Sequence, residues 1–114
     1  NNSSTFHEMA LQRLHINIAS TPSSPWNIPD LAKPLHISTR HLQKLYQEKF
    51  GTSCMEDVIE HRLLLAKEKL ATTTLPIYKI AEQCGYSNVE HFSRQFKGKF
   101  TTSPKAYRES VKKN

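Results

Sequence analysis

The chain has 114 residues, of which 37% are hydrophobic and 23% are charged, and its formal net charge is +6 with an isoelectric point near 9.5. This length fits one domain, or two very small lobes that share a helix. No apolar run approaches the length of a membrane span and no signal-peptide pattern is present, so we expect a cytoplasmic protein without a membrane partner.

The first predicted helix begins at Thr5, because Thr5-x-x-Glu8 has the pattern of a capping box. Residues 21–25, Thr-Pro-Ser-Ser-Pro, end this helix. Its expected inward face carries apolar residues at helical spacing, namely Phe6, Met9, Ala10, Leu14 and Ile18.

Asn27 is expected to cap a second helix, with Pro29 in its first turn, where a missing amide costs nothing. Pro34 disfavours helical angles at Lys33, so this helix should end a turn early. A third helix begins after Ser38 and stops at Gly51. The inward residues of these two helices are Leu31, Ala32, Leu35, Leu42, Leu45, Tyr46 and Phe50.

A long connecting helix is predicted over about residues 53–72, opened by the capping box Ser53-x-x-Glu56. Its apolar stripe is Met55, Val58, Ile59, Leu63, Ala66 and Leu70. About twenty residues that rise by about 1.5 Å each make it about 30 Å long.

The rest of the chain predicts three further helices. A short one with Ile77, Ile80, Ala81 and Cys84 inward turns at Gly85, and the next, capped by Ser87-x-x-Glu90, buries Phe92, Phe96 and Phe100. Ser103-Pro104 opens a last helix through Ala106, Tyr107 and Val111. The predicted fold is therefore all-α with about seven helices: a lobe over about residues 5–52, the connecting helix, and a second lobe over about 76–112.

Residues 28–54 and 77–104 repeat each other. Identities fall at an offset of 49 for Ile28, Ala32 and Ser38, and at an offset of 50, after one inserted residue, for His41, Lys49, Phe50, Thr52 and Ser53. Each copy has a short helix, a turn and a longer basic helix, which is the layout of a helix-turn-helix unit. Two recognition helices about 30 Å apart approximate one turn of B-DNA, about 34 Å, so a monomer could enter two successive major-groove segments of double-stranded DNA.

Basic residues concentrate in and after the longer helix of each copy, as a phosphate-facing surface requires. Residues 92–114 carry seven basic side chains and a single acidic one. The predicted DNA-facing residues are Thr39, Arg40, Gln43, Lys44 and Gln47 in the first lobe, and Asn88, Val89, Glu90, Ser93, Arg94 and Lys97 in the second. The alternative is a solvated polar face.

These two faces differ in chemistry. Arginine and lysine suit guanine, glutamine suits adenine, and valine suits the methyl group of thymine. Glu90 has two interpretations, as the acid of a capping box or as an acceptor from cytosine, and the cap is favoured. Because the second face offers fewer donors, we expect the second lobe to position the protein more than it specifies the sequence.

Residues 80–108, IAEQCGYSNVEHFSRQFKGKFTTSPKAYR, resemble the signature of AraC/XylS-type transcription regulators, closed by Pro104, Tyr107 and Arg108. The resemblance extends over about residues 6–110 and spans many positions, unlike a short motif. It implies two helix-turn-helix lobes joined by a long helix, with DNA contacts at Arg40, Gln43, Lys44 and Arg94. It also implies activation of transcription through RNA polymerase and a separate sensing, dimerising or receiver domain, and a start at Asn1 rather than Met fits a piece of a longer protein.

In the first lobe His36 stands where the second lobe has Gly85, and histidine tolerates left-handed angles less well than glycine. This departure from the family's pattern affects the expected angle of the first recognition helix.

Two other functions compete with DNA binding. One is a protein-interaction module whose helix faces bind RNA polymerase or a partner domain. The other is an enzyme, because some related domains are fused to DNA-repair methyltransferases that use a reactive cysteine. Neither Cys54 nor Cys84 lies in an acceptor motif, and no catalytic constellation occurs, so we expect no enzyme activity. The cysteines and the histidines show no metal-ligand spacing, so we expect neither metal nor cofactor.

Overall fold

The computed structural model describes the backbone of residues 2–112 and the side chains of residues 5–112. Over this range the chain is helical, without a strand, which confirms the all-α prediction. The elements are α1 (Asn2–Ser20), α2 (Ile28–Ala32), the 3-10 turn η1 (Lys33–Leu35), α3 (Thr39–Phe50), α4 (Cys54–Thr72), α5 (Ile77–Gln83), α6 (Val89–Phe100) and α7 (Pro104–Lys112).

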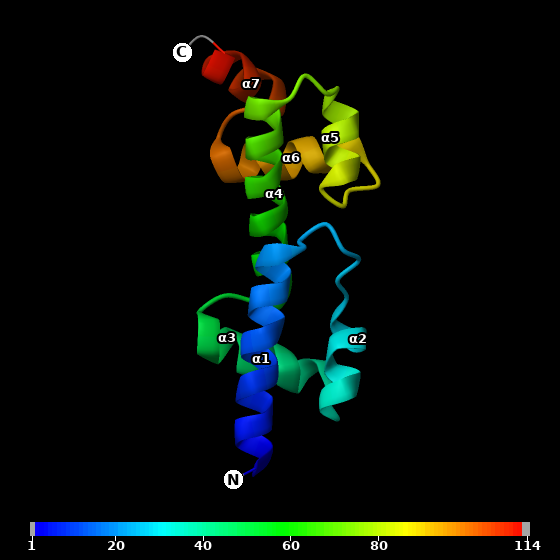
Figure 1. Cartoon of the computed structure of the whole chain (residues 1–114), viewed down its shortest axis with the longest axis vertical. Coiled ribbons are helices and arrows are strands. Elements are labelled where there is room, and N and C mark those ends of the chain that lie inside the picture. The colour runs from blue at the N-terminus through cyan, green and yellow to red at the C-terminus, as the bar shows by residue number, and fades with distance from the viewer. Residues whose placement is uncertain (1, 113–114) are drawn as a thin grey trace. The chain divides into compact units, whose positions relative to one another are not determined.

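The chain divides into two compact units, residues 1–61 and residues 62–114, and the division falls inside α4. Unit one contains the helix pair α2 and α3, and unit two contains the pair α5 and α6 (Figure 1). Each pair consists of a short helix, a turn and a 12-residue helix. Each unit is therefore built around one helix-turn-helix pair.

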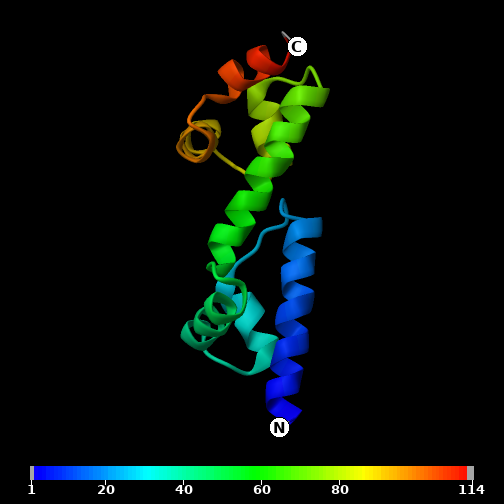
Figure 2. The same cartoon turned by 90° about the vertical axis from the view of Figure 1, so that its left-hand side faces the viewer.

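In unit one, α2 and α3 lie on one side of α1 (Figure 2). The buried cluster is formed by apolar residues from α1 to the start of α4: Leu11, Leu14, Ile18, Ile28, Ala32, Leu35, Leu42, Tyr46, Cys54 and Val58. The first helix begins at Asn2 rather than at Thr5, so the predicted capping box is wrong and Thr5 lies within the helix.

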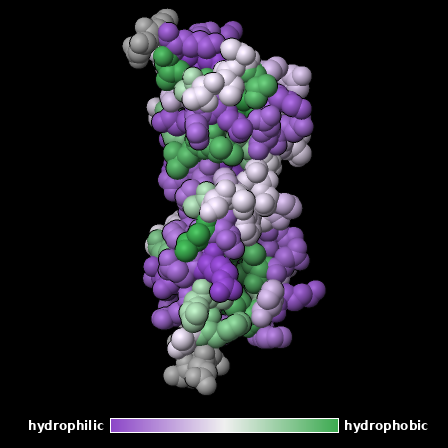
Figure 3. Space-filling view, viewed as in Figure 1, coloured by the Kyte–Doolittle hydropathy of each residue, from purple (hydrophilic) through white to green (hydrophobic). Residues whose placement is uncertain are grey.

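The predicted inward face of α1 is also partly wrong. Phe6 and Met9 are 53% and 61% exposed, whereas Leu11, which the prediction omitted, is buried. The reason is that α1 carries apolar residues on two opposite faces, and periodicity alone does not say which face meets the core. The surface of this unit accordingly shows apolar patches among polar side chains (Figure 3).

A buried carboxylate connects α4 to α3 and α1 within unit one. Asp57 is 3% exposed, and its Oδ2 accepts hydrogen bonds from the Tyr46 hydroxyl at 2.5 Å and faces His15 Nδ1 at 3.0 Å. On its other oxygen, Oδ1, His61 Nδ1 lies at 3.1 Å. Burial, and next the hydrogen bond to Asp57, raise the pKa of the Tyr46 hydroxyl, which therefore remains a donor. These bonds fix α3 against α1 and α4.

Unit two has a core of aliphatic residues from α4 and α5 and aromatic residues from α6. Its buried apolar residues are Leu63, Ala66, Leu70, Ile80, Ala81, Cys84, Tyr86, Phe92 and Phe96. As predicted, Ser103 caps the last helix, because its Oγ accepts from the Ala106 amide at 3.1 Å. Ala106 is exposed.

The Arg108 side chain holds the end of α4 and the segment after it. Its guanidinium donates to the carbonyl oxygens of Leu70, Thr73 and Leu75 at 3.2, 3.3 and 2.7 Å. The α4 helix leaves its last carbonyl groups without intrahelical partners, and a planar guanidinium can serve several of them at once. Arg108 thus uses its donors inside the unit.

Candidate nucleic-acid interface

The turn before each recognition helix contains one residue at positive φ. His36 has φ 56° and ψ 39°, and Gly85 has φ 99°, which confirms the predicted equivalence of the two positions. The short helix of unit one ends early, as predicted, and tightens into η1 at Lys33–Leu35. Lys33 nevertheless keeps helical angles, φ −56° and ψ −52°, so the predicted effect of Pro34 on Lys33 is wrong. A 3-10 turn accommodates the proline without moving its neighbour out of the helical region.

The caps of the two recognition helices correct the register of the repeat. Ser38 Oγ accepts from the His41 amide at 3.0 Å, and Asn88 Oδ1 accepts from the His91 amide at 2.8 Å. Asn88, and not the predicted Ser87, is therefore the cap of α6. The one-residue insertion lies between Gly85 and Asn88, so Ser38 is equivalent to Asn88. Glu90 is the second residue of α6, which removes its interpretation as the acid of a capping box.

The outward face of α3 is as the sequence predicts. Leu42 and Tyr46 are fully buried, so the opposite side of this helix faces solvent. The five predicted DNA-facing residues are all exposed: Thr39, Arg40, Gln43, Lys44 and Gln47. They start in the first turn of the helix, from which recognition helices contact base edges.

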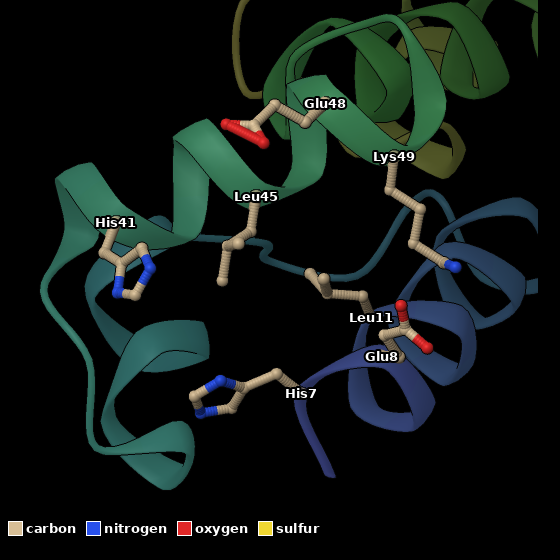
Figure 4. A pocket seen from close by; sticks show the side chains of 7 residues that line it. All are labelled: His7, Glu8, Leu11, His41, Leu45, Glu48 and Lys49. Carbon is tan, nitrogen blue, oxygen red and sulfur yellow. The ribbon is translucent and has the colours of Figure 1, made fainter. Parts of the chain in front are cut away.

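A third side of α3 faces α1 across a hollow of about 500 Å³ (Figure 4). Leu11 and Leu45 point into it, His7 and His41 lie at one end, and Lys49 lies at the other. Lys49 is therefore directed toward α1, although the sequence counts it among the basic residues of the repeat. None of the five predicted DNA-facing residues lines this hollow.

The outward face of α6 is set by Phe92 and Phe96, which are fully buried. Of the six residues predicted here, Ser93 is half-buried and the others are exposed: Asn88, Val89, Glu90, Arg94 and Lys97. Asn88 uses its carbonyl oxygen in the cap, which leaves its amide nitrogen to face outward.

The charged groups of the two faces are free to meet an anion. Among the side chains of residues 5–112, no carboxylate lies within ion-pair distance of Arg40, Lys44, Arg94 or Lys97. Other basic residues of unit two have internal contacts: Lys67 lies over the rings of Phe100 and Tyr107, at 4.6 and 5.2 Å from their centroids. The positive charge available to an external anion is thus smaller than the number of basic residues in unit two suggests.

One exposed residue beside α6 escaped the sequence argument. Tyr78, on α5, is 62% exposed and lines a hollow of about 390 Å³ together with Val89 at the start of α6. The available signal was an aromatic residue on a short helix, outside the predicted inward face of Ile77, Ile80 and Ala81.

The cysteines and histidines offer no reactive centre in the described chain. Cys54 and Cys84 are free and fully buried, and burial raises the pKa of each thiol to about 11. The thiolate that a nucleophile requires is therefore disfavoured. Over residues 5–112 no group of three or more His, Cys, Asp or Glu side chains is placed to hold a metal ion. None of the described helices combines the length and apolar composition needed to cross a bilayer.

Comparison with known proteins gives consistent matches. A family described as a helix-turn-helix domain matches residues 31–110. The regulatory protein SoxS of Salmonella typhimurium is 34% identical over 105 residues, which are 92% of this chain and 98% of SoxS. The uncharacterized HTH-type transcriptional regulator YfiF of Bacillus subtilis is 36% identical over 102 residues, 90% of this chain and 32% of its own length. The chain thus spans about a third of YfiF, and about a third of two further regulators that it matches.

Among solved structures, the DNA-binding domain of AdpA in complex with a target DNA has the same fold. Its TM-score is 0.83 at 20% identity, covering 90% of this chain and 93% of that one.

Proposed function

Because the chain belongs to the AraC/XylS-type family of bacterial transcription regulators, as a DNA-binding helix-turn-helix domain, we propose that it reads a specific DNA sequence through α3 and α6 together. Both recognition helices would enter the major groove of one duplex, in two successive segments. The observation that carries the proposal is that Arg40, Gln43 and Lys44 are exposed on the side of α3 opposite its buried face.

The chemistry of this face suits base reading. Arginine and lysine donate to the O6 and N7 atoms of guanine, and glutamine pairs with the N6 and N7 atoms of adenine. On α6, Arg94 and Lys97 offer positive charge for phosphates, and Thr39, Gln47, Asn88, Val89, Glu90 and Ser93 complete the proposed contact set.

Selection of binding sites from a random DNA pool, followed by footprinting of the 114-residue chain, tests the proposal. We expect a protected region of about two turns of duplex and an affinity that falls steeply with salt. Alanine at Arg40, Gln43 or Lys44 should relax the preference at particular base pairs by about 1–3 kcal/mol. Glu48→Ala, on the α1-facing side of the same helix, is the matched control and should leave the preference unchanged.

A footprint confined to one groove segment would contradict the use of both helices. An equal loss of affinity on all sequences for the three alanine variants would assign these side chains to phosphates instead of bases.

Contact with RNA polymerase, activation of transcription and control by a sensing, dimerising or receiver domain are proposals drawn from the family. A bacterial cytoplasm, where chromosomal DNA lies, is the proposed place of action.

Exposed apolar side chains on α1 favour a protein partner as a second function: Phe6, Met9 and Ile16 are 53%, 61% and 54% exposed. Serine at these positions should leave DNA affinity unchanged and lower transcription from a reporter, and unchanged transcription would remove this second function.

No catalytic role is proposed, since burial of both thiols disfavours the nucleophile that a methyl-acceptor cysteine needs.

A further inference from the structure

An exposed apolar surface adjoins the proposed DNA-facing side of α6. Val89, the first residue of α6, is 36% exposed, and Tyr78 of α5 is 62% exposed. Both line the same hollow of about 390 Å³, together with Ala81, Glu82, Tyr86 and Ser87. The exposed apolar area of these two side chains, which line one hollow, suits a partner with an apolar group.

The surroundings hold this surface in place before DNA arrives. Tyr86, at the base of the hollow, donates its hydroxyl to Gln95 Oε1 at 2.5 Å, and its ring packs on Phe92 at 5.3 Å between centroids. Asn88 caps α6 directly before Val89. Glu82 is the one carboxylate among the residues that line the hollow, and its Oε1 lies 3.5 Å from Lys79 Nζ. The positive charge of Lys79 reduces the repulsion between Glu82 and a DNA phosphate.

We propose that Val89 and Tyr78 read the 5-methyl group of a thymine in the major groove. This inference rests on the proposed function, because it requires α6 to enter the groove. Among the groups that base pairs present there, the thymine methyl is the apolar one, and it contacts apolar side chains. The first residues of a recognition helix are the ones that reach base edges, and Val89 lies one turn before Ser93 on the same side of α6.

The first lobe lacks this surface, which makes it an internal comparison. Through the repeat, Val89 corresponds to Thr39 and Tyr78 corresponds to Pro29. The first lobe therefore offers hydrogen-bonding groups on its recognition helix, whereas the second offers an apolar contact at the start of α6. The second lobe would then contribute to specificity and not only to position, contrary to the expectation from its small number of donors.

Deoxyuridine differs from thymidine only by the methyl group, so it isolates the proposed contact. The probe is the duplex selected from the random pool, with each thymine replaced in turn by deoxyuridine, bound to the 114-residue chain. For the unsubstituted chain we expect about fourfold weaker binding at one thymine, the equivalent of about 0.8 kcal/mol for one buried methyl group. Val89→Ala should lose this discrimination: its affinities for the two duplexes should agree, which makes the pair a double-mutant cycle.

Matched variants separate the contact from general damage. Tyr78→Ala should reduce the discrimination and Tyr78→Phe should keep it, because the ring and not the hydroxyl forms the apolar wall. Thr39→Ala, at the equivalent position of the first lobe, should leave the discrimination at this thymine unchanged. Circular dichroism melts of each variant confirm that α6 is folded at the temperature of the binding assay.

The outcomes separate this inference from the proposed function. If no sequence is enriched from the pool, the proposed function fails and the inference fails with it. If a sequence is enriched but Val89→Ala discriminates thymine from deoxyuridine as well as the unsubstituted chain does, only the inference is overturned. A 5-methylcytosine–guanine pair at the same position tests the other source of this methyl group, and stronger binding there than to thymine would overturn thymine as the target.

Discussion

A basic residue of a DNA-binding domain can stabilise the fold or contact a phosphate, and we expect Arg108 to stabilise the fold. Its guanidinium donates to three carbonyl oxygens, of Leu70, Thr73 and Leu75, at 2.7–3.3 Å. Hydrogen bonds from a charged donor contribute about 1.5–3 kcal/mol each, and less where water can replace them. Because this side chain is only partly buried, we expect Arg108→Ala to cost about 2–4 kcal/mol in total. For a unit of this size that loss lowers the melting temperature by roughly 10–20 °C.

The assay combines thermal melts with the salt dependence of DNA binding. A side chain that contacts a phosphate contributes about 0.9 to the slope of log affinity against log salt concentration. Arg108→Ala should have a lower melting temperature than the unsubstituted chain. Its slope of log affinity against log salt concentration should be unchanged when DNA binding is measured at a temperature at which the variant is fully folded. Arg94→Ala is the matched control: it should lower the slope by about 0.9 and leave the melting temperature unchanged.

Arg108→Lys sharpens the test, since it keeps the charge but lacks the planar fork that serves several carbonyl groups. We expect it to melt nearly as early as the alanine variant. The reasoning is refuted if Arg108→Ala melts like the unsubstituted chain while its salt slope falls by about 0.9, because Arg108 would then hold a phosphate.

Three further predictions concern backbone strain and burial. Thr101, the C-cap of α6, has φ 61°, and the equivalent C-cap of α3 is Gly51 with φ 74°. Thr101→Gly should therefore stabilise the chain by about 1 kcal/mol in urea unfolding, and Gly51→Thr should do the reverse. Gly85→Val, at φ 99°, should cost about 1–3 kcal/mol and abolish specific DNA binding, whereas His36→Gly should be neutral or mildly stabilising; unchanged melts for Gly85→Val would contradict the strain. Burial raises the pKa of both thiols from 9.0 to about 11, so their protonated forms favour the folded state. The contribution of the thiols to stability should therefore be constant below about pH 9 and be lost toward pH 11, by up to about 3 kcal/mol per thiol, and Cys84→Ala should reduce the loss of stability in this pH range.

Four helix starts were predictable from sequence, because a side chain at each accepts from the backbone amide three residues on. Asn27, Ser38, Ser53 and Ser103 accept from the amides that their positions predict, at 3.0–3.1 Å. These caps join residues that are close in sequence, so a local pattern can predict them, although the same kind of pattern at Thr5 and Ser87 predicted caps that the structure does not have. The outward face of α3 followed equally from its buried stripe.

Other features depend on contacts that no local pattern encodes. Ser87 and Asn88 are adjacent residues that can both cap a helix, and the choice between them follows from how α5 and α6 pack. The side of α1 that meets the core was ambiguous because both sides are apolar. In the sequence Arg108 looks like another phosphate-facing charge, and its carbonyl partners lie 33 to 38 positions away. The exposed surface of Tyr78 and Val89 likewise needs the turn between α5 and α6 to bring its two members together.

The two copies hold their longer helices, α3 and α6, in place with different side chains at equivalent positions. This difference matches the DNA contacts proposed for each helix. At an offset of 50, Tyr46 corresponds to Phe96 and Asp57 to Tyr107. In unit two the Phe96 and Tyr107 rings pack at 5.9 Å, whereas in unit one the Tyr46 hydroxyl donates to a buried carboxylate at 2.5 Å.

Ring packing tolerates small displacements, but a hydrogen bond weakens steeply with a change in angle or length. The directional anchor thus holds α3, whose proposed base contacts are themselves hydrogen bonds of strict geometry. The ring contact holds α6, whose proposed methyl contact is an apolar one without a preferred direction. The lobe whose proposed base contacts are hydrogen bonds is thus the lobe with a buried polar network, in which the contacts of Asp57 with Tyr46, His15 and His61 offset the cost of burying its carboxylate.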